Sequence, residues 1–307
     1  MRNAFAEEVF NLAKKDKEIV LLSGDIGNRL FDNFRKKFTN RFFNCGIAEA
    51  NMTGVAAGLA ATGFKPITYT IAPFNTIRCL EQIKLDICYP NLPVVLVGTG
   101  SGLSYATLGS THHSLEDISI LKSLPNIKIL CPSDPLEVKK LLKTAIKLKN
   151  PVYLRIGKKR EKIFNNRKKF GKLDLIKKGQ INCLLSIGPI LENVFIASKK
   201  LDKSSISNSV YDLRHIRPFD EKKVKEIFKK YKKIFIIEEH YKNVGVFNSI
   251  LHWSNSIGLD GRKLYSIGVD NKFIKFTGEQ ELARRKVGLD PESIYRFVKK
   301  IDDKIRI

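Results

Sequence analysis

The residue whose surroundings most clearly suggest chemistry is Glu49. It stands near the start of a segment that is otherwise small and largely apolar, Cys45-Gly46-Ile47-Ala48-Glu49-Ala50-Asn51-Met52-Thr53, and the small residues continue to Ala60. A carboxylate in this setting has few local partners, and burial would disfavour its charged form and raise its pKa. It could then hold a proton at neutral pH and give it to a ring nitrogen. The alternative is a solvated glutamate in an ordinary first helical turn, where the helix dipole favours it.

Further polar side chains in the first half of the sequence follow predicted strands or turns. Asp25 comes after a predicted strand and before a glycine turn, which is the usual place for ligand residues in α/β proteins. A turn-forming aspartate is the alternative there. His112 and His113 follow a Gly-Ser-Thr turn, and a histidine near its ordinary pKa can exchange hydrogen bonds with a substrate hydroxyl. Adjacent histidines on a regular element diverge, which disfavours a metal site and leaves solvated loop residues as the alternative.

Four segments, taken in order, resemble the transketolase family in its pyrimidine-binding and C-terminal domains. They are Ser23-Gly24-Asp25-Ile26-Gly27, Gly46-Ile47-Ala48-Glu49, Gly109-Ser110-Thr111-His112-His113 and Cys131-Pro132-Ser133-Asp134. The chain is similar to the stand-alone C-terminal subunits of split transketolases from about Ala4 to Lys300, most strongly over 19–157. The resemblance implies thiamine diphosphate as cofactor. Protonation of its aminopyrimidine ring converts the 4′-amine into the imine base that deprotonates the thiazolium carbon, and Glu49 would supply that proton.

The resemblance also implies which residues surround the cofactor and substrate. Phe74 stands where the family places an aromatic cluster, and stacking there would fix the plane of the aminopyrimidine. Tyr69 is a second cofactor-binding candidate, although both rings could be core residues at a strand end. His112 would reach substrate hydroxyls beside the thiazolium as a catalytic and substrate-binding residue, and His113 is a lesser substrate-binding candidate.

Asp25 and Arg155 match family positions in the active site, whereas a third match lies in the C-terminal domain. Asp25 matches an active-site position beside the cofactor. Arg155 ends a predicted strand where family members often bind a sugar phosphate, for which a bidentate guanidinium suits the anion. Glu239-His240 resembles a C-terminal-domain motif that is more structural or interfacial than catalytic.

The sequence departs from the family pattern in ways that affect the expected partner and substrate. It contains no Gly-Asp-Gly, the motif that with a downstream Asn binds Mg²⁺ and the diphosphate; Gly24-Asp25 imitates it, but Ile26 replaces the required glycine. The Mg²⁺ ligands are therefore expected on a partner N-terminal subunit that carries this motif, in an α2β2 heterotetramer. Leu108 and Gly100 stand where full-length members carry Asp and His, which puts ordinary pentose-phosphate specificity in doubt.

The predicted function is the C-terminal subunit of a thiamine-diphosphate-dependent transketolase, a transferase that moves a two-carbon ketol unit between sugar phosphates or related sugars. One alternative is the beta subunit of a 2-oxoacid dehydrogenase or an enzyme like deoxyxylulose-phosphate synthase. The histidine loop favours transketolase over the dehydrogenase. The alternative of another class is a non-catalytic basic binding or regulatory protein, because the formal charge is +24. The basic clusters lack interleaved aromatics and known nucleic-acid-binding spacings, so nucleic acid is not the expected partner.

Alternating strand and helix patterns predict an α/β protein with two three-layer domains and largely parallel sheets. The expected domains are 1–157 and 173–307, joined by a charged, non-periodic linker at 158–172. Strands are predicted at 19–22, 94–97, 127–130, 152–156, 181–186, 209–213, 234–238 and 263–267. Helices are predicted at 5–14, with Asn3 as N-cap, and at 50–61, 76–88, 115–124, 136–148, 191–201, 221–231, 244–255 and 291–301.

The expected location is the cytoplasm. No apolar run reaches the roughly 18 residues of a membrane span, and Glu7 and Glu8 fall where a signal peptide would need apolar residues. The five cysteines are widely spaced without a C-x-x-C pair, as is typical of free thiols in a reducing compartment.

Overall fold

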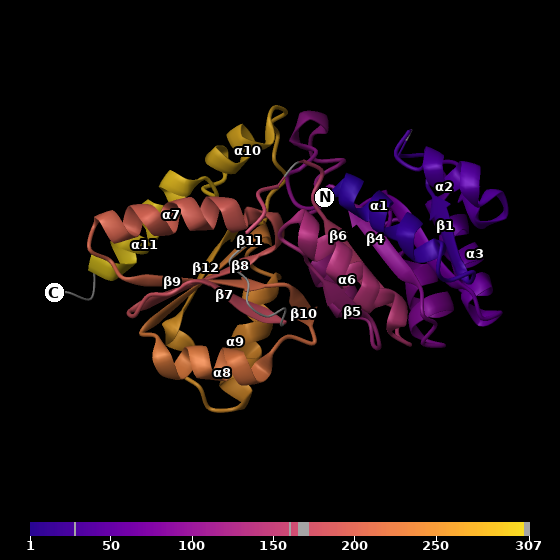
Figure 1. Cartoon of the computed structure of the whole chain (residues 1–307). Coiled ribbons are helices and arrows are strands. Elements are labelled where there is room, and N and C mark those ends of the chain that lie inside the picture. Colours follow the sequence, from indigo (N-terminus) through magenta and orange to yellow (C-terminus); the bar gives the residue numbers. More distant parts are fainter. Residues whose placement is uncertain (28, 160, 165–171, 304–307) are drawn as a thin grey trace.

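The computed structural model describes residues 1–27, 29–159, 161–164 and 172–303. Two α/β domains lie side by side, the first coloured indigo to magenta and the second orange to yellow (Figure 1). Each has a central, largely parallel sheet with helices on both faces. The predicted fold class is confirmed.

The first domain is built on a seven-stranded sheet in the order β10-β5-β6-β4-β3-β1-β2. Six strands are parallel neighbours and come from the first half of the chain: β1 (Ile19–Ser23), β2 (Phe42–Asn44), β3 (Lys65–Ile71), β4 (Val95–Thr99), β5 (Lys128–Leu130) and β6 (Val152–Ile156). β1, β4 and β6 are buried along their whole length, as parallel strands covered on both faces are expected to be.

Helices cover the two faces of this sheet through separate apolar clusters. α1 (Arg2–Ala13) and α6 (Pro135–Lys147) pack on one face, and α3 (Glu49–Ala61) packs on the other with the π-helix η2 (Ile83–Cys88). Shorter helical segments connect them: α2 (Asp32–Lys37), η1 (Thr39–Arg41), α4 (Leu80–Gln82), η3 (Ala106–Leu108) and α5 (Asp117–Lys122).

The second domain has a five-stranded sheet in the order β12-β11-β8-β9-β7, in which only β7 is antiparallel to its neighbour. The strands are β7 (Leu173–Lys177), β8 (Asn182–Ile187), β9 (Asn208–Leu213), β11 (Lys233–Tyr241) and β12 (Leu264–Val269). One face carries α7 (Leu191–Lys203), α10 (Gln280–Lys286) and α11 (Pro291–Asp303), and the other carries α8 (Glu221–Lys230) and α9 (Val246–Ser256) (Figure 1). The short turns η4 (Gly188–Ile190) and η5 (Gly261–Lys263) precede α7 and β12.

The two domains share both a sheet and their apolar cores. β10 (His215–Arg217) lies in the second half of the sequence but pairs antiparallel with β5 at the edge of the first sheet. Leu103, Ala106 and Leu115 of the first domain belong to the same apolar cluster as Ile190 and Leu191 of the second. The domains therefore pack as one continuous body.

Most predicted elements appear within one to three residues of their expected bounds. The N-cap prediction is wrong, because α1 begins at Arg2 and places Asn3 inside the helix. The helix expected at 76–88 begins only at Leu80 and continues as a π-helix. Residues 160 and 165–171 of the expected linker lie outside the described residues. Among the described residues, no helix is long and apolar enough to cross a membrane.

Candidate functional site

The site is built around Glu49, the first residue of α3, next to the carboxyl end of β1. The Glu49 side chain is 1% exposed, although Ile47, two residues earlier, is 78% exposed. Gly24, just after β1, makes this close approach possible, because a Cβ there would lie 3.2 Å from Glu49 Cγ and 3.1 Å from Thr70 Cβ. The carboxylate is therefore buried at the carboxyl edge of the sheet, and the alternative of a solvated glutamate is excluded.

Glu49 has a partner that the sequence analysis missed. Arg78 Nη1 donates a hydrogen bond of 2.7 Å to Glu49 Oε2. The expectation of few partners considered only neighbours along the helix, whereas Arg78 lies 29 positions further along the chain. The Arg78 guanidinium also lies over Phe74, with its central carbon 4.2 Å from the ring centroid.

The turn that carries Phe74 and Arg78 is fixed from beneath by buried polar side chains. Asn75 Nδ2 donates to the Val97 carbonyl at 3.1 Å and to Thr68 Oγ1 at 3.1 Å. Thr76 Oγ1 donates to the Ala72 carbonyl at 2.7 Å. Because both anchoring side chains are fully buried, the turn holds Phe74 and Arg78 in a defined place, and Arg78 connects Phe74 to Glu49.

His112 completes this group from a separate loop. Its ring lies edge-on to Phe74, with centroids 5.2 Å apart, and 6.2 Å from the ring of Tyr105. Partial burial, followed by the positive charges of Arg78 and Lys158, lowers the pKa of His112. The ring is therefore neutral at pH 7 and can accept a hydrogen bond.

The loop that presents His112 is tied to the second domain. Ser110 Oγ donates to the Ile274 carbonyl at 2.7 Å, and the Gly278 amide donates to the Ala106 carbonyl at 3.2 Å. His113 points inward and is 4% exposed. Burial lowers its pKa against the opposing charge of Glu239. Only the first histidine of the pair thus faces Phe74.

Tyr69 and Asp25 lie apart from this group. Tyr69 is fully buried in the cluster beneath α1, where its ring stacks on Phe5 at 5.2 Å and meets Phe31 edge-on at 4.9 Å. Those are the surroundings of a core residue. Asp25 is exposed and has a left-handed backbone with φ of 51°. Asn44 Nδ2 donates to its carboxylate at 2.9 Å.

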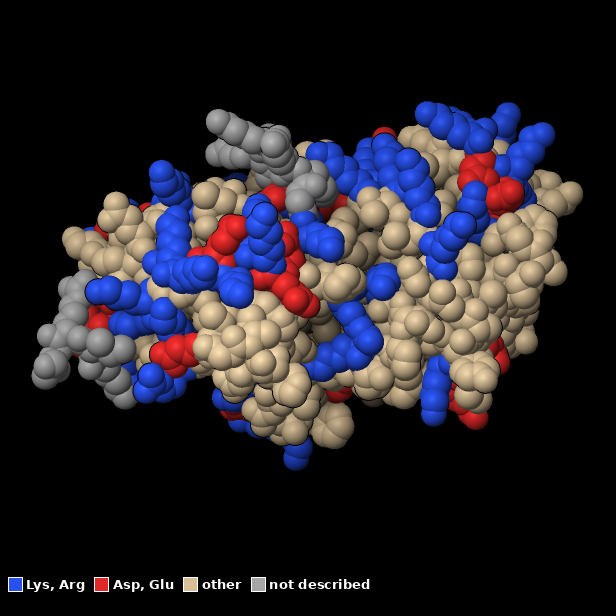
Figure 2. All heavy atoms as spheres, turned by 90° about the horizontal axis from the view of Figure 1, so that it is seen from below, with Lys and Arg blue, Asp and Glu red and all other residues tan. Residues whose placement is uncertain are grey.

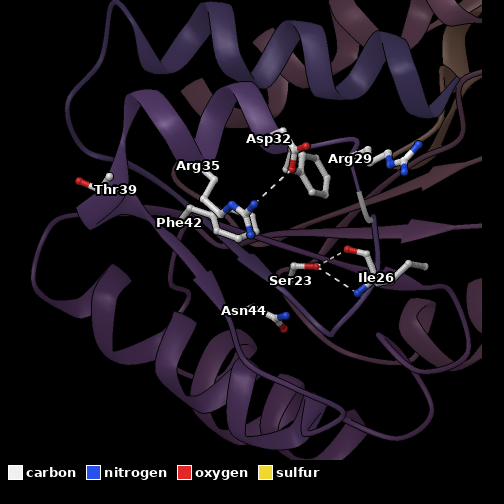
Figure 3. A pocket seen from close by; sticks show the side chains of 9 residues that line it. Ser23, Ile26, Arg29, Asp32, Arg35, Thr39, Phe42 and Asn44 are labelled. Carbon is white, nitrogen blue, oxygen red and sulfur yellow. Dashed lines mark hydrogen bonds and ion pairs between the residues drawn. The ribbon is translucent and has the colours of Figure 1, made fainter.

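Asn44 ties the Asp25 turn to the segment that leads into α3. Its Oδ1 accepts from the Asp25 amide at 3.2 Å and from the Gly46 amide at 3.0 Å. Figure 3 shows Asn44 at the edge of a hollow of about 710 Å³. The hollow is lined by Ser23, Ile26, Arg29, Phe31, Asp32, Arg35, Thr39, Phe42 and Asn44. It lies beside the Asp25 turn, and Glu49, Phe74 and His112 are outside its lining.

Arg155 lies near the end of β6 as predicted, but it is buried, which does not fit a phosphate ligand. It is 1% exposed, and its Nε donates to Asp117 Oδ2 at 2.7 Å. Its Nη2 donates to the carbonyls of Ser114 at 2.8 Å and Glu239 at 3.1 Å. Burial opposes the charge on Asp117, but Arg155 lowers the pKa of that carboxyl overall. The buried guanidinium joins the two domains and presents no open face to a sugar phosphate.

The Glu239-His240 motif is confirmed as interfacial. Both oxygens of Glu239 accept from Arg284, at 2.9 and 3.2 Å, while its carbonyl accepts from Arg155 of the first domain. His240 is fully buried, and its Nε2 lies 3.4 Å from the Ser119 amide. β11 therefore carries the polar side of the domain interface.

Positive side chains gather around Tyr105, beyond His112. Lys158 Nζ lies 4.2 Å from the centroid of the Tyr105 ring. Burial, together with the charges of Arg2 and Lys159, lowers the pKa of Lys158. Burial raises the pKa of Tyr105, while the charge of Arg2 acts in the opposite direction. The sequence analysis missed this group, because its members come from the chain start, the histidine loop and the end of β6.

Comparison with known proteins places the whole chain in one family. The family profile described as "Transketolase, pyrimidine binding domain" matches residues 1–161, and the profile "Transketolase, C-terminal domain" matches residues 171–294. The chain is 33% identical to a subunit of the apulose-4-phosphate transketolase of Actinobacillus succinogenes, over 96% of each protein. It is 32% identical to a protein of Methanocaldococcus jannaschii described as "Putative transketolase C-terminal section", over 97% of this chain and 95% of that protein.

A solved structure agrees with these sequence matches. It is described as a split gene transketolase, inactive beta4 tetramer, and superposes with a TM-score of 0.85 at 28% identity, covering 97% of this chain and 96% of the other. Related sequences also include 1-deoxy-D-xylulose-5-phosphate synthase of Clostridium perfringens, 31% identical over 95% of this chain but only 48% of that enzyme. The chain belongs to the transketolase family, of which it carries the pyrimidine-binding and C-terminal domains.

Proposed function

We propose that this chain is the C-terminal, or beta, subunit of a split thiamine-diphosphate-dependent transketolase. The enzyme would transfer a two-carbon ketol unit between sugar phosphates or related sugars. The observation that carries the proposal is the grouping of Glu49, Phe74 and His112 at one edge of the first sheet. The transketolase subunit from Actinobacillus succinogenes, which aligns along nearly all of this chain, supports the division of the enzyme into subunits.

The residues present fit the aminopyrimidine half of thiamine diphosphate. A buried carboxylate beside an aromatic face can bind a flat, nitrogen-containing ring by its edge and its plane. Glu49 would hold a proton for the ring nitrogen, and Phe74 would fix the plane of the ring. When bound, the cofactor supplies the acidic thiazolium carbon that accepts the ketol unit. Neutral His112 would exchange a hydrogen bond with a substrate hydroxyl next to that carbon.

The partner would be an N-terminal transketolase subunit that carries Gly-Asp-Gly and a downstream Asn. It would hold Mg²⁺ and the diphosphate, and the expected assembly is α2β2. Large apolar side chains support docking near Glu49: Ile47, Leu85 and Tyr89 are 78%, 50% and 86% exposed, and Val55 of α3 is 42% exposed. Surfaces of this kind commonly mark protein–protein interfaces.

The substrate phosphate would bind near Tyr105 and not at Arg155. Lys158, Lys159 and Arg2 approach this side of the site, whereas the Arg155 guanidinium is buried between the domains. Clustered cations lower the free energy of a bound dianion. The basic group therefore fits a phosphorylated sugar better than an uncharged one.

The test is reconstitution with the N-terminal subunit of the same organism. The mixture should gain transketolase activity that requires both Mg²⁺ and thiamine diphosphate, and EDTA should abolish it. Each subunit alone should be inactive. Robust turnover by the highly purified chain alone would contradict the division of the site between two subunits.

The runner-up is a deoxyxylulose-phosphate-synthase-like enzyme, favoured by relatives of that name. The beta subunit of a 2-oxoacid dehydrogenase is a further enzymatic alternative. Pyruvate consumption by the reconstituted complex, without ketose-phosphate cleavage, would support one of these. A purely basic binding protein is less well supported, because on the face shown in Figure 2 the Lys and Arg side chains are dispersed over both domains among acidic and uncharged residues. The five free cysteines, four of them buried, fit the proposed cytoplasmic location.

A further inference from the structure

Arg78 makes the two contacts that the proposed site offers to an aminopyrimidine ring. A ring bound there would place its face on Phe74 and its edge against Glu49. The Arg78 guanidinium, which is also flat and rich in N–H donors, lies over Phe74 with its central carbon 4.2 Å from the centroid. It donates to Glu49 Oε2 at 2.7 Å. Arg78 thus occupies both positions that the ring would take, the face of Phe74 and the hydrogen bond to Glu49.

We propose that Arg78 is an internal stand-in for the aminopyrimidine ring, which must swing away before the cofactor can reach Glu49. This inference rests on the proposed function, because it takes thiamine diphosphate as the ligand. Arg78 is not among the residues that the sequence predicted for the site. Before the cofactor binds, Arg78 gives the buried carboxylate a charged partner. Afterwards the ring takes over the hydrogen bond to Glu49.

The burial of the two paired side chains shows which of them can move. Glu49 is 1% exposed, whereas the Arg78 side chain is 44% exposed at the outer end of the turn. The turn itself is anchored through Asn75 and Thr76, so a change in the rotamers of Arg78 does not require the backbone or Phe74 to move. A long, partly exposed side chain can rotate into solvent at a small cost in free energy.

The electrostatics explain why a stand-in is useful to the chain before assembly. A buried carboxylate without a partner costs several times as much free energy as one that keeps a hydrogen-bonded cation. Only the Arg78 side of the pair is open to water, so Arg78 can leave into solvent when another partner takes over the carboxylate. Arg78 thereby keeps Glu49 in place and competes with the incoming ring. Removal of Arg78 should consequently favour cofactor binding.

The experiment measures thiamine diphosphate binding to the reconstituted complex by isothermal titration calorimetry in the presence of Mg²⁺. We expect Arg78→Met to bind the cofactor about 2- to 10-fold more tightly than the wild type, because an ion pair and a cation–π contact no longer compete. Arg78→Lys, which can pair with Glu49 but cannot stack as a plane, should give an intermediate affinity. Arg262→Met is the matched control, since Arg262 is exposed and pairs with Asp260 in the second domain.

The outcomes separate this inference from the proposed function. If Arg78→Met binds the cofactor with unchanged or weaker affinity while the wild type binds normally, Arg78 is not a stand-in. If the wild-type complex binds no thiamine diphosphate at all, the proposed function fails and the stand-in fails with it. Melting curves of the unmixed subunits show whether each variant is folded. Arg78→Met should melt at a lower temperature than the wild type, because Glu49 loses its partner.

Discussion

If the proposed function holds, Glu49 binds two partners of opposite kind. In the chain alone its carboxylate accepts a hydrogen bond from the Arg78 cation; in the proposed reaction it holds a proton for a ring nitrogen. Only a carboxylate that is buried but reachable from one side can do both. The N-terminus of α3 provides this position, because its small residues bring the helix close to Gly24 and the sheet.

Replacement of Glu49 by glutamine should separate binding from proton transfer. Gln can still hydrogen-bond to the aminopyrimidine, but it has no proton of suitable acidity to give. We expect hydrogen–deuterium exchange at the thiazolium carbon of the bound cofactor to slow by about 10²–10⁴-fold. NMR after acid quench of the reconstituted complex measures this rate. Unchanged exchange in Glu49→Gln would remove Glu49 from the role.

Replacement of His112 by alanine should affect the sugar donor and leave cofactor activation intact. One lost hydrogen bond to a neutral group lowers kcat/KM by about 2- to 12-fold, and more if charge develops there. In the wild type, the acid limb of the kcat/KM profile should lie below pH 6.5, since burial and the nearby cations lower the pKa of His112. Removal of the Lys158 charge should move that limb to higher pH. A profile that is identical in wild type and His112→Ala would exclude this residue.

The sequence indicated which residues could form the site, but not the contacts that they make. Glu49 could be found because a single carboxylate at the start of a run of small residues is conspicuous, and His112 because it follows a glycine turn. Arg78 could not be found, because nothing in its own segment shows that it lies against a helix start far back in the chain. Arg155 was placed at the correct end of β6, but its burial depends on the second domain, which no local pattern describes.

The segment from β4 through η3 to His112 determines whether the family's His and Asp would fit at positions 100 and 108 of this chain. Gly100 has φ of +80°, and a Cβ there would lie 2.0 Å from Tyr105 Cε2. Leu108, at the end of η3, is 50% exposed. The family's histidine therefore has no room at position 100 unless Tyr105 moves. An aspartate at position 108, in contrast, would point into solvent and has room.

We therefore expect opposite results from the two substitutions that would restore the family pattern. Gly100→His should destabilise the chain by more than about 1–3 kcal/mol, from the left-handed backbone alone, with the clash in addition. Leu108→Asp should stay within about 0.5 kcal/mol of the wild type and improve the use of ordinary ketose phosphates. Melting temperatures and kcat/KM for the donor check the two parts. If the Gly100→His protein were as stable as the wild type, the prediction would be wrong, and Tyr105 could move aside to make room for the histidine.

The elements that sequence patterns missed are short, exposed or dependent on distant partners. β2 is a partly exposed edge strand, and β10 has only three residues, whose strand conformation comes from pairing with β5. β3 was missed because Lys65, Pro66, Thr68 and Thr70 break its apolar pattern, although its central residues are fully covered. The mostly apolar strands β1 and β6 needed no such context and were predicted almost to the residue.

At the scale of the whole molecule, a partly buried histidine makes the joined domains sensitive to acid. His215 lies on β10 between the domains, and burial, with the charges of Lys172 and Arg214, lowers its pKa to about 4. The unfolded chain would take up a proton near pH 6.5, which the folded chain does not. Unfolding thus becomes easier as the pH falls below 6.5, and this loss continues until the pH reaches the folded pKa.

We expect His215 to account for about 1–2 kcal/mol of the stability lost between pH 7 and pH 5. Urea unfolding at both pH values measures the loss in the wild type and in His215→Asn, which has no ionisable side chain. The variant should lose less stability than the wild type over this interval. His252→Asn, at a helix position on α9, is the control for a change of histidine elsewhere. Equal losses in wild type and His215→Asn would contradict the assignment.

The pairing of β10 with the first sheet also has a consequence during synthesis. The ribosome releases β1 to β6 before it has made residues 215–217. For a time, β5 is therefore an unpaired edge strand of the nascent first sheet. Open strand borders invite pairing with other chains. The segment between the two domains is therefore a poor place to split this protein into two chains. The upstream product would keep β5 as an unpaired edge strand, whereas a chain that holds both domains covers β5 with its own β10.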